Sequence, residues 1–97
     1  MKIVTVGRAP DNNIILFDDK VSGKHASFTL TDKQEYYVQD FNSTNGTFVN
    51  GNKIGNEPFQ ILPKDTVKIG KTIVPWQTYL SDRFEPAKTF PKAPVRQ

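Results

Sequence analysis

Short strand-like runs recur about every ten residues along most of this chain, with turn-forming residues between them. The run 26–30 alternates apolar and polar side chains, which is typical of a strand with one buried face. The run 14–17 is continuously apolar and predicts a buried strand. No stretch carries apolar residues at helical spacing, so the sequence predicts an all-β fold, either a β-sandwich or a β-barrel. The expected strands are residues 3–6, 14–17, 26–30, 36–40, 47–49, 58–62, 66–69 and 72–79.

The densest turn signal lies in residues 40–51, which contain two Asn-Gly pairs. Asn-Gly favours a tight turn because both residues tolerate a positive φ. Between the pairs, residues 47–49 are β-branched or aromatic and predict a short strand. Ser43, Thr44 and Asn45 are therefore expected on a loop, where they either cap their own backbone or bind a ligand.

The composition of the 97-residue chain excludes several kinds of site. There is no cysteine and only one histidine, so we expect no disulfide framework, no metal centre and no cofactor. No run approaches the ~18 apolar residues of a membrane span, so no membrane insertion is expected. No signal peptide is visible at the start of the sequence, and a cytoplasmic setting is expected.

The charge distribution argues against nucleic-acid binding. The net charge is +3. Residues 1–80 hold nine Lys or Arg against eight Asp or Glu, a net of +1, whereas residues 81–97 hold four against two, a net of +2. A protein that binds the phosphate backbone needs its basic residues on one folded face, and most of this excess lies in the tail.

Residues 81–97 differ in character from the rest of the chain. They carry three prolines and scattered charges, which predicts an extended linker after a domain at residues 1–80. The chain is therefore expected to be a module of a longer protein. Thr89 could be a phosphorylation site read by this domain or a neighbouring one, although a plain linker is the simpler interpretation.

Three predicted loops carry polar groups that suit an anion: Gly7-Arg8, residues 22–25 and residues 43–46. If the strand ends bring them together, they offer a guanidinium, several hydroxyls, an amide and a backbone N–H exposed by glycine, with no matching carboxylate. Such a set of donors suits a dianionic phosphate. Taken singly, each residue has an ordinary alternative as a solvated charge, a turn cap or a brace between loops. Their joint occurrence favours the phosphate.

Over roughly residues 3–80, the sequence resembles the forkhead-associated (FHA) domain family in the order and spacing of three motifs. They are Gly7-Arg8, Ser22-Gly23-Lys24-His25-Ala26 and Asp40-x-x-Ser43-Thr44-Asn45-Gly46-Thr47-Phe48-Val49-Asn50-Gly51. The resemblance implies a two-sheet β-sandwich of about eleven strands, with ligand loops at one end. It also implies that these loops bind an extended phosphothreonine peptide, since phospho-motif recognition is already established for the family.

By position, the resemblance assigns Arg8 and Ser22 to the phosphate oxygens, with a further hydroxyl from Thr44. Asn45 would hydrogen-bond the main chain of the peptide. The supporting positions would be Gly7 and Gly46 as shapers of the loops, His25 as a structural tie between loops, the Gly23 N–H near the phosphate, and Lys24.

Two positions depart from the family pattern. Gly23 lacks a side chain that some relatives use, and Lys64 stands where the family usually has glycine in a turn. The residues expected to set preference around the phosphothreonine are Lys20, Lys24 and Asn42, and the two lysines favour acidic ligand positions.

Catalysis is not expected. Residues 46–51 match the G-x-x-x-x-G spacing of a nucleotide-binding loop, but Asn52 stands where the lysine is required. A triad of Ser22, His25 and Asp40 lacks a nucleophile elbow. The remaining alternative is a structural or dimerising sandwich that binds partners independently of phosphate. The joint retention of all four phosphate-site residues argues against it.

Overall fold

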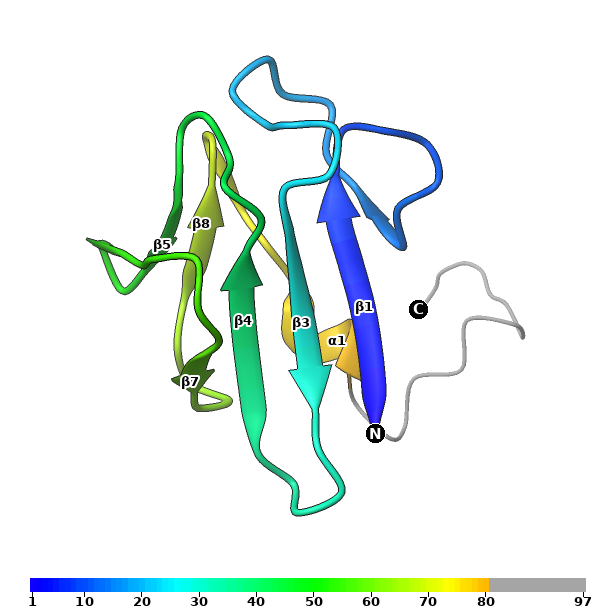
Figure 1. Ribbon diagram of the computed structural model, residues 1–97, viewed down its shortest axis with the longest axis vertical. Helices are drawn as coiled ribbons and strands as arrows, with labels where there is room; N and C mark the ends of the chain where they lie inside the picture. The colour runs from blue at the N-terminus through cyan, green and yellow to red at the C-terminus, as the bar shows by residue number, and fades with distance from the viewer. Residues whose placement is uncertain (81–97) are drawn as a thin grey trace, which may run out of the picture.

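The computed structural model describes residues 1–80, which form two β-sheets and one short helix (Figure 1). The expected linker at residues 81–97, with Thr89, lies outside the described residues. The elements are β1 (Lys2–Gly7), β2 (Ile14–Ile15), β3 (Ala26–Leu30), β4 (Tyr36–Asp40), β5 (Thr47–Val49), β6 (Asn52–Lys53), β7 (Phe59–Ile61), β8 (Val67–Ile69), β9 (Thr72–Ile73) and α1 (Trp76–Leu80).

The strands form a five-stranded sheet in the order β2-β1-β3-β4-β7 and a four-stranded sheet in the order β6-β5-β8-β9. All neighbouring strands are antiparallel except the pair β1 and β2. Fully buried side chains from both sheets meet in one core, among them Val6, Phe28, Val38, Val67 and Ile69. The predicted all-β sandwich is confirmed. Residues 1–80 contain nine strands, where the resemblance implied about eleven.

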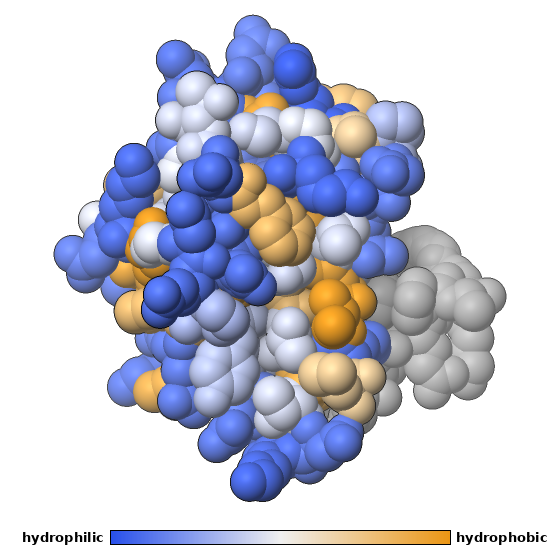
Figure 2. Space-filling view, viewed as in Figure 1, coloured by the Kyte–Doolittle hydropathy of each residue, from blue (hydrophilic) through white to orange (hydrophobic). Residues whose placement is uncertain are grey.

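The alternating run of β3 lies at the centre of the five-stranded sheet. Ala26, Phe28 and Leu30 are buried, as the alternation predicts, whereas Ser27 on the opposite face is buried as well instead of exposed. Phe28 is paired with Val4 of β1 and Val38 of β4. The opposite face of this sheet is turned toward the reader in Figure 2 and is mostly hydrophilic, with a few scattered apolar side chains. An antiparallel sheet with one face in the core and one in water has this pattern.

The prediction that residues 14–17 form a continuously buried strand is wrong. Ile14 and Leu16 are buried, but Ile15 is 37% exposed and Phe17 is 89% exposed. The strand β2 has two residues and, within residues 1–80, lies at the edge of its sheet and is paired with β1 alone. Side chains of residues 14–17 alternate between core and solvent, because only one face of a sheet in a sandwich meets the core.

The strand expected at residues 72–79 ends at Ile73, and the sequence reading missed the helix α1. Its two buried residues, Trp76 and Leu80, are four positions apart and lie on one helical face. The Trp76 ring stacks on Phe28 with centroids 5.7 Å apart and meets Tyr36 edge-on at 5.3 Å. A five-residue helix is too short to show a periodic stripe, so its only sequence signal is this pair following Pro75.

Two turns bear on the family pattern. Asn50 and Gly51 have φ values of 51° and 88°, and they join β5 to β6 in a two-residue hairpin that matches the Asn-Gly prediction. Lys64 is not among the non-glycine residues with positive φ in the described part of the chain. Its turn is closed instead by Asp65, whose N–H donates to Leu62 O at 2.9 Å. Glycine is therefore not required at position 64.

Candidate functional site

The three polar loops predicted from the sequence meet at one end of the sandwich. They follow β1, precede β3 and follow β4, and Figure 1 shows these strand ends side by side. The backbone joins the first two loops directly: Arg8 N–H donates to Ser22 O at 3.0 Å, and Ala9 N–H donates to Gly23 O at 3.1 Å. These bonds place Arg8 beside Ser22 at a fixed register.

The third loop is tied to the second through Ser22. Thr44 N–H donates to Ser22 Oγ at 3.3 Å, although the two residues are 22 positions apart. Ser22 Oγ accepts this bond, so its own hydrogen remains available to a further acceptor. Arg8, Ser22 and Thr44 are thus linked in one continuous chain of contacts.

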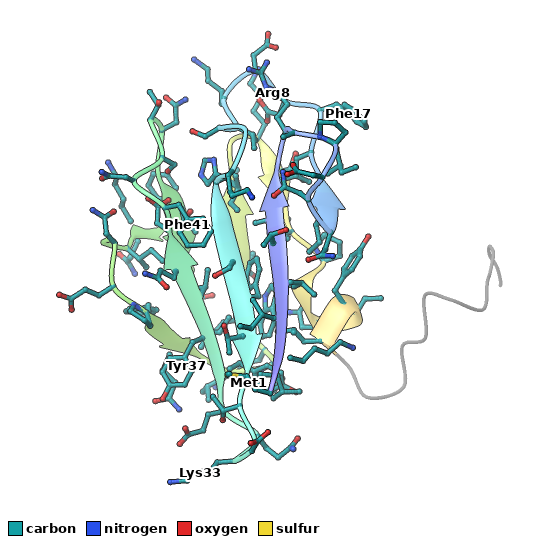
Figure 3. All side chains as sticks on the ribbon, turned by 45° about the vertical axis from the view of Figure 1, so that its right-hand side comes forward. Met1, Arg8, Phe17, Lys33, Tyr37 and Phe41 are labelled. Atoms are coloured by element: carbon teal, nitrogen blue, oxygen red, sulfur yellow. The ribbon has the colours of Figure 1, made fainter. Side chains whose placement is uncertain are left out.

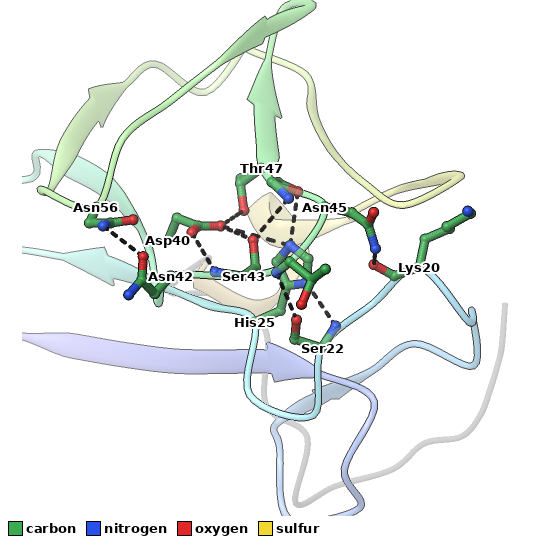
Figure 4. A network of polar contacts seen from close by, with 11 residues as sticks. Lys20, Ser22, His25, Asp40, Asn42, Ser43, Asn45, Thr47 and Asn56 are labelled. Carbon is green, nitrogen blue, oxygen red and sulfur yellow. Dashed lines mark hydrogen bonds and ion pairs between the residues drawn. The ribbon is translucent and has the colours of Figure 1, made fainter.

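His25 is completely buried and joins the same two loops (Figure 4). Ser22 N–H donates to its Nδ1 at 3.0 Å, and its Nε2 lies 2.9 Å from Gly46 O. A backbone N–H can only donate, so Nδ1 must be unprotonated and Nε2 must carry the hydrogen donated to Gly46. Both ring nitrogens are occupied in this way, which leaves His25 no free nitrogen to serve as a base for Ser22.

Asp40 organises the loop that carries Thr44 and Asn45. Its buried carboxylate accepts hydrogen bonds from Ser43 N at 2.9 Å, Ser43 Oγ at 2.6 Å and Thr47 Oγ1 at 2.7 Å. Burial would raise the pKa of the Asp40 carboxyl, but the hydrogen bonds from Ser43 and Thr47 outweigh it and hold that pKa below its ordinary value. Asp40 therefore stays charged at neutral pH and fixes the loop.

Asn45 reaches from the third loop to the loop before β3. Its Nδ2 donates to Lys20 O at 2.9 Å, and its side chain is exposed (Figure 4). Within residues 1–80, its Oδ1 has no hydrogen-bond partner. One end of the amide is thus anchored, while the carbonyl oxygen is presented to solvent.

Two cations of the site loops, Arg8 and Lys24, are each close to a carboxylate. Arg8 Nη1 lies 3.8 Å from Asp19 Oδ1, and Lys24 Nζ lies 3.8 Å from Asp11 Oδ2. Figure 3 shows Arg8 and Phe17 at the loop end of the molecule, with Lys33 at the opposite end. Exposed pairs at this distance are weak, so the Arg8 guanidinium can turn toward a bound anion.

The glycine positions of the site differ in whether they could hold a side chain. A Cβ on Gly7 would lie 2.2 Å from Gly23 O, so only glycine fits there. Gly46 has a φ of 91°, which also favours glycine. A Cβ on Gly23 would meet nothing closer than 3.9 Å, so the missing side chain at this position is not required by packing.

Two bracing residues were not singled out from the sequence. Asn12 is buried, and its Nδ2 donates to Ala9 O at 2.9 Å and to Gly23 O at 2.7 Å. Asp18 accepts from Lys71 N at 2.7 Å and from Lys20 N at 2.8 Å, and these bonds lower the pKa of its carboxyl. Asp18 thereby fixes the Lys20 loop against the turn between β8 and β9. Only the turn-forming character of both residues was visible in the sequence.

The groups brought together are a guanidinium, two hydroxyls and an amide, all able to donate hydrogen bonds, and all exposed except the half-buried Ser22. This set suits an anion with several acceptor oxygens. In the part of the chain that the structure describes, no group of three or more His, Cys, Asp or Glu residues could hold a metal ion. No helix within residues 1–80 is long and apolar enough to span a bilayer.

Comparisons with known proteins show which family the sequence matches. The FHA domain family model matches residues 4–70. FHA domain-containing protein FhaB of Mycobacterium tuberculosis is 37% identical over 71 residues, which cover 73% of this chain and 44% of FhaB. Glycogen accumulation regulator GarA of the same organism is 41% identical over 69 residues, covering 71% of this chain and 41% of GarA. The chain thus spans less than half the length of either relative.

A solved structure gives the same result for the fold. The N-terminal FHA domain of Saccharomyces cerevisiae Rad53p, in complex with a phosphothreonine peptide, is 31% identical in sequence and superimposes with a TM-score of 0.65. The match covers 71% of this chain and 56% of that one.

Proposed function

Because this chain belongs to the FHA domain family, we propose that it binds phosphothreonine-containing segments of partner proteins through the loops at one end of its sandwich. The observation that carries the proposal is the chain of contacts from Arg8 through Ser22 to Thr44. The phosphothreonine peptide bound to the related Rad53p domain supports the choice of ligand.

Each phosphate-site residue has a role that follows from its contacts. Arg8 supplies the positive charge and two parallel donors to the dianionic phosphate. Ser22 donates its hydroxyl hydrogen, which its bond from Thr44 N–H leaves free. The exposed Thr44 hydroxyl and the Gly23 N–H complete the donors around the phosphate oxygens. The free Oδ1 of Asn45 accepts from a main-chain N–H of the peptide.

The bonds of His25, Asp40 and Asn12 tie the loops to one another within the domain itself. Binding to such a site costs little conformational entropy. The second phosphate pKa is about 6, so affinity falls as the pH drops below that value and the ligand loses charge. Preference for phosphothreonine over phosphoserine requires a small pocket for the γ-methyl group, whose burial contributes about 1 kcal/mol.

Lys20 is the strongest candidate for a preference at ligand positions next to the phosphothreonine. Its main-chain oxygen is fixed by Asn45, while its exposed amine has no carboxylate within 4.0 Å among residues 1–80. Lys24 already has Asp11 nearby, and Asn42 Oδ1 accepts from Asn56 Nδ2 at 3.0 Å. An acidic ligand residue near Lys20 is therefore favoured over one near Lys24.

The domain division and the setting belong to the same proposal. Residues 1–80 would form the binding domain and residues 81–97 a linker to other parts of a protein. Phosphothreonine is made by kinases that consume ATP, so we expect the domain to work in the cytoplasm as a non-catalytic signalling module.

Isothermal titration of a phosphothreonine peptide, with its phosphoserine and unmodified forms, tests the function. We expect binding of the phosphothreonine form only, or preferentially. The Arg8→Ala variant should lose about 2–5 kcal/mol, or more than about thirtyfold in affinity. Lys33→Ala is the matched control, because it removes one charge at the opposite end of the molecule (Figure 3). Equal binding of modified and unmodified peptides would favour the phosphate-independent sandwich instead.

A further inference from the structure

The outer face of the four-stranded sheet carries a row of lysines and apolar side chains that the loop site does not use. Lys53 of β6 is paired with Phe48 of β5, Phe48 with Lys68 of β8, and Lys68 with Ile73 of β9. Directly opposed residues of antiparallel strands project from the same face. The four side chains therefore form one row across all four strands.

This row points away from the core. The neighbouring residues Val49, Val67 and Ile69 are buried, whereas Phe48 is half-buried and Ile73 is 65% exposed. A hollow of about 530 Å³ lies along the row. Its lining consists of Phe48, Asn50, Gly51, Thr66, Lys68, Gly70 and Ile73. This volume is large enough to hold one apolar side chain of a partner protein.

The row itself carries two positive charges, while the Asp18 and Asp65 carboxylates lie beside Gly70 and Asn50 at the margin of the hollow. Within residues 1–80, no carboxylate lies within 4.0 Å of the amines of Lys53 or Lys68. Residues 41–80 contain four lysines against two acidic residues, a net of +2, whereas residues 1–40 contain five basic and six acidic residues, a net of −1. One of the two acids, Asp65, already accepts bonds from Leu62 N and Asn50 Nδ2.

We propose that the outer face of the four-stranded sheet is a second docking surface, which binds an acidic segment with a central apolar residue on a partner protein. Phe48, which stands between Lys53 and Lys68 in the row, would contact the apolar side chain, and the two lysines would pair with carboxylates on either side of it. The two lysines are two strands apart, or about 10 Å, which is about three residues of an extended chain. A single-stranded nucleic acid fits less well, because stacking platforms need several aromatic rings and this row has one.

The surface adjoins the loop site without sharing its ligand groups. The stem of Lys53 lies against Gly46, and Gly70 in the lining of the hollow lies against Asp18, which fixes the Lys20 loop. One partner can therefore occupy both surfaces, and joining two contacts in this way raises the overall affinity. The proposal does not depend on phosphate binding by Arg8.

The test is an NMR titration of the ¹⁵N-labelled protein with the unphosphorylated peptide Glu-Glu-Leu-Phe-Glu-Glu. We expect amide shifts at Phe48, Lys68 and Ile73, and binding that weakens as the salt concentration rises. Lys68→Glu should weaken binding by about tenfold or more, whereas Lys33→Glu, with the same change in net charge, should bind as wild type. Arg8→Ala should also bind as wild type, which separates this surface from the loop site.

Several outcomes would overturn the proposal. They are no binding up to about 1 mM peptide, shifts confined to the loops or to the five-stranded sheet, equal binding by Lys68→Glu, and equal binding of Lys-Lys-Leu-Phe-Lys-Lys. Tighter binding of a deoxythymidine decamer to the same face would replace the acidic partner with nucleic acid. If Lys68→Glu is not folded by circular dichroism, Lys68→Gln provides the same comparison with a smaller change.

Discussion

Gly7 offers a sharp test of how the loop site is built, because it can be compared with a second glycine in direct contact with it. An alanine at position 7 would place its Cβ 2.2 Å from Gly23 O and 2.8 Å from Asn12 Nδ2. An alanine at position 23 would meet no atom closer than 3.9 Å, and the φ of Gly23 is not in the left-handed region. The same added methyl group is therefore expected to destabilise the protein at position 7 and to be tolerated at position 23.

The expected cost at position 7 follows from the bonds that must break. An ordinary contact requires the 22–23 loop to move by about 1 Å, since van der Waals contacts begin near 3.4 Å. Gly23 O would then lose the bonds from Ala9 N at 3.1 Å and Asn12 Nδ2 at 2.7 Å. Two lost hydrogen bonds with partly buried partners cost about 2–4 kcal/mol. For a domain of this size, that cost lowers Tm by about 10–25 °C.

Thermal unfolding followed by circular dichroism measures this difference. Gly7→Ala should show the large decrease in Tm, and its affinity for a phosphothreonine peptide should fall at a temperature where it is still folded. Gly23→Ala should remain within about 0.5 kcal/mol of wild type, or gain slightly because alanine restricts the unfolded chain. Equal Tm values for the two variants would refute the claim that the close approach of Gly7 to Gly23 holds the two loops in register.

Three further predictions concern stability and charge. The Asp40 carboxyl has a lowered pKa in the folded protein, so its charge stabilises the fold above the ordinary carboxyl pKa of about 4. This contribution is lost as the pH falls below that value. In urea unfolding, the free energy of unfolding should therefore decrease less between about pH 5 and pH 3 for Asp40→Asn than for wild type. Asp19→Asn removes the carboxylate beside Arg8 and should raise phosphopeptide affinity by up to about fivefold at low salt, an increase that calorimetry should no longer detect at high salt. Trp76→Ala removes a fully buried ring stacked on Phe28 and should cost about 3–5 kcal/mol in chemical unfolding, and a cost near zero would contradict the role of α1 in the core.

The sequence predicted those parts of the fold that depend on local chemistry. The strand at 26–30 and the Asn-Gly turn at 50–51 each depend on neighbouring residues, and both are found in the structure, although Ser27 on the outer face of that strand is buried as well. The buried strand at 14–17 and the strand at 72–79 were wrong for a different reason. Exposure of Ile15 and Phe17 depends on which face of the chain meets the other sheet, and α1 depends on the stacking of Trp76 on Phe28, which is 48 positions away.

In the candidate site, too, features set by neighbouring residues were predicted, and features set by distant contacts were not. Arg8, Ser22, Thr44 and Asn45 stand in motifs whose spacing is visible in the sequence, and their assignment to a ligand stays a prediction. The residues that hold these loops in place are harder to find. Asp18 bonds to Lys71, which is 53 positions away, and Asn12 bonds to the main-chain oxygen of Gly23. Contacts to backbone atoms of distant residues leave no pattern of side-chain types in a single sequence.

The imidazole of His25 couples the opening of two loops, because it bonds to both of them. One ring holds the main chain of both Ser22 and Gly46, so a rotation of the imidazole breaks the contacts to the second and third loops together. We therefore expect the Ser22 amide hydrogen to exchange with solvent only when the neighbouring loop also opens. In evolution, a copy of this domain that loses the ring would lose recognition in a single step while keeping a β-sandwich free to acquire another use.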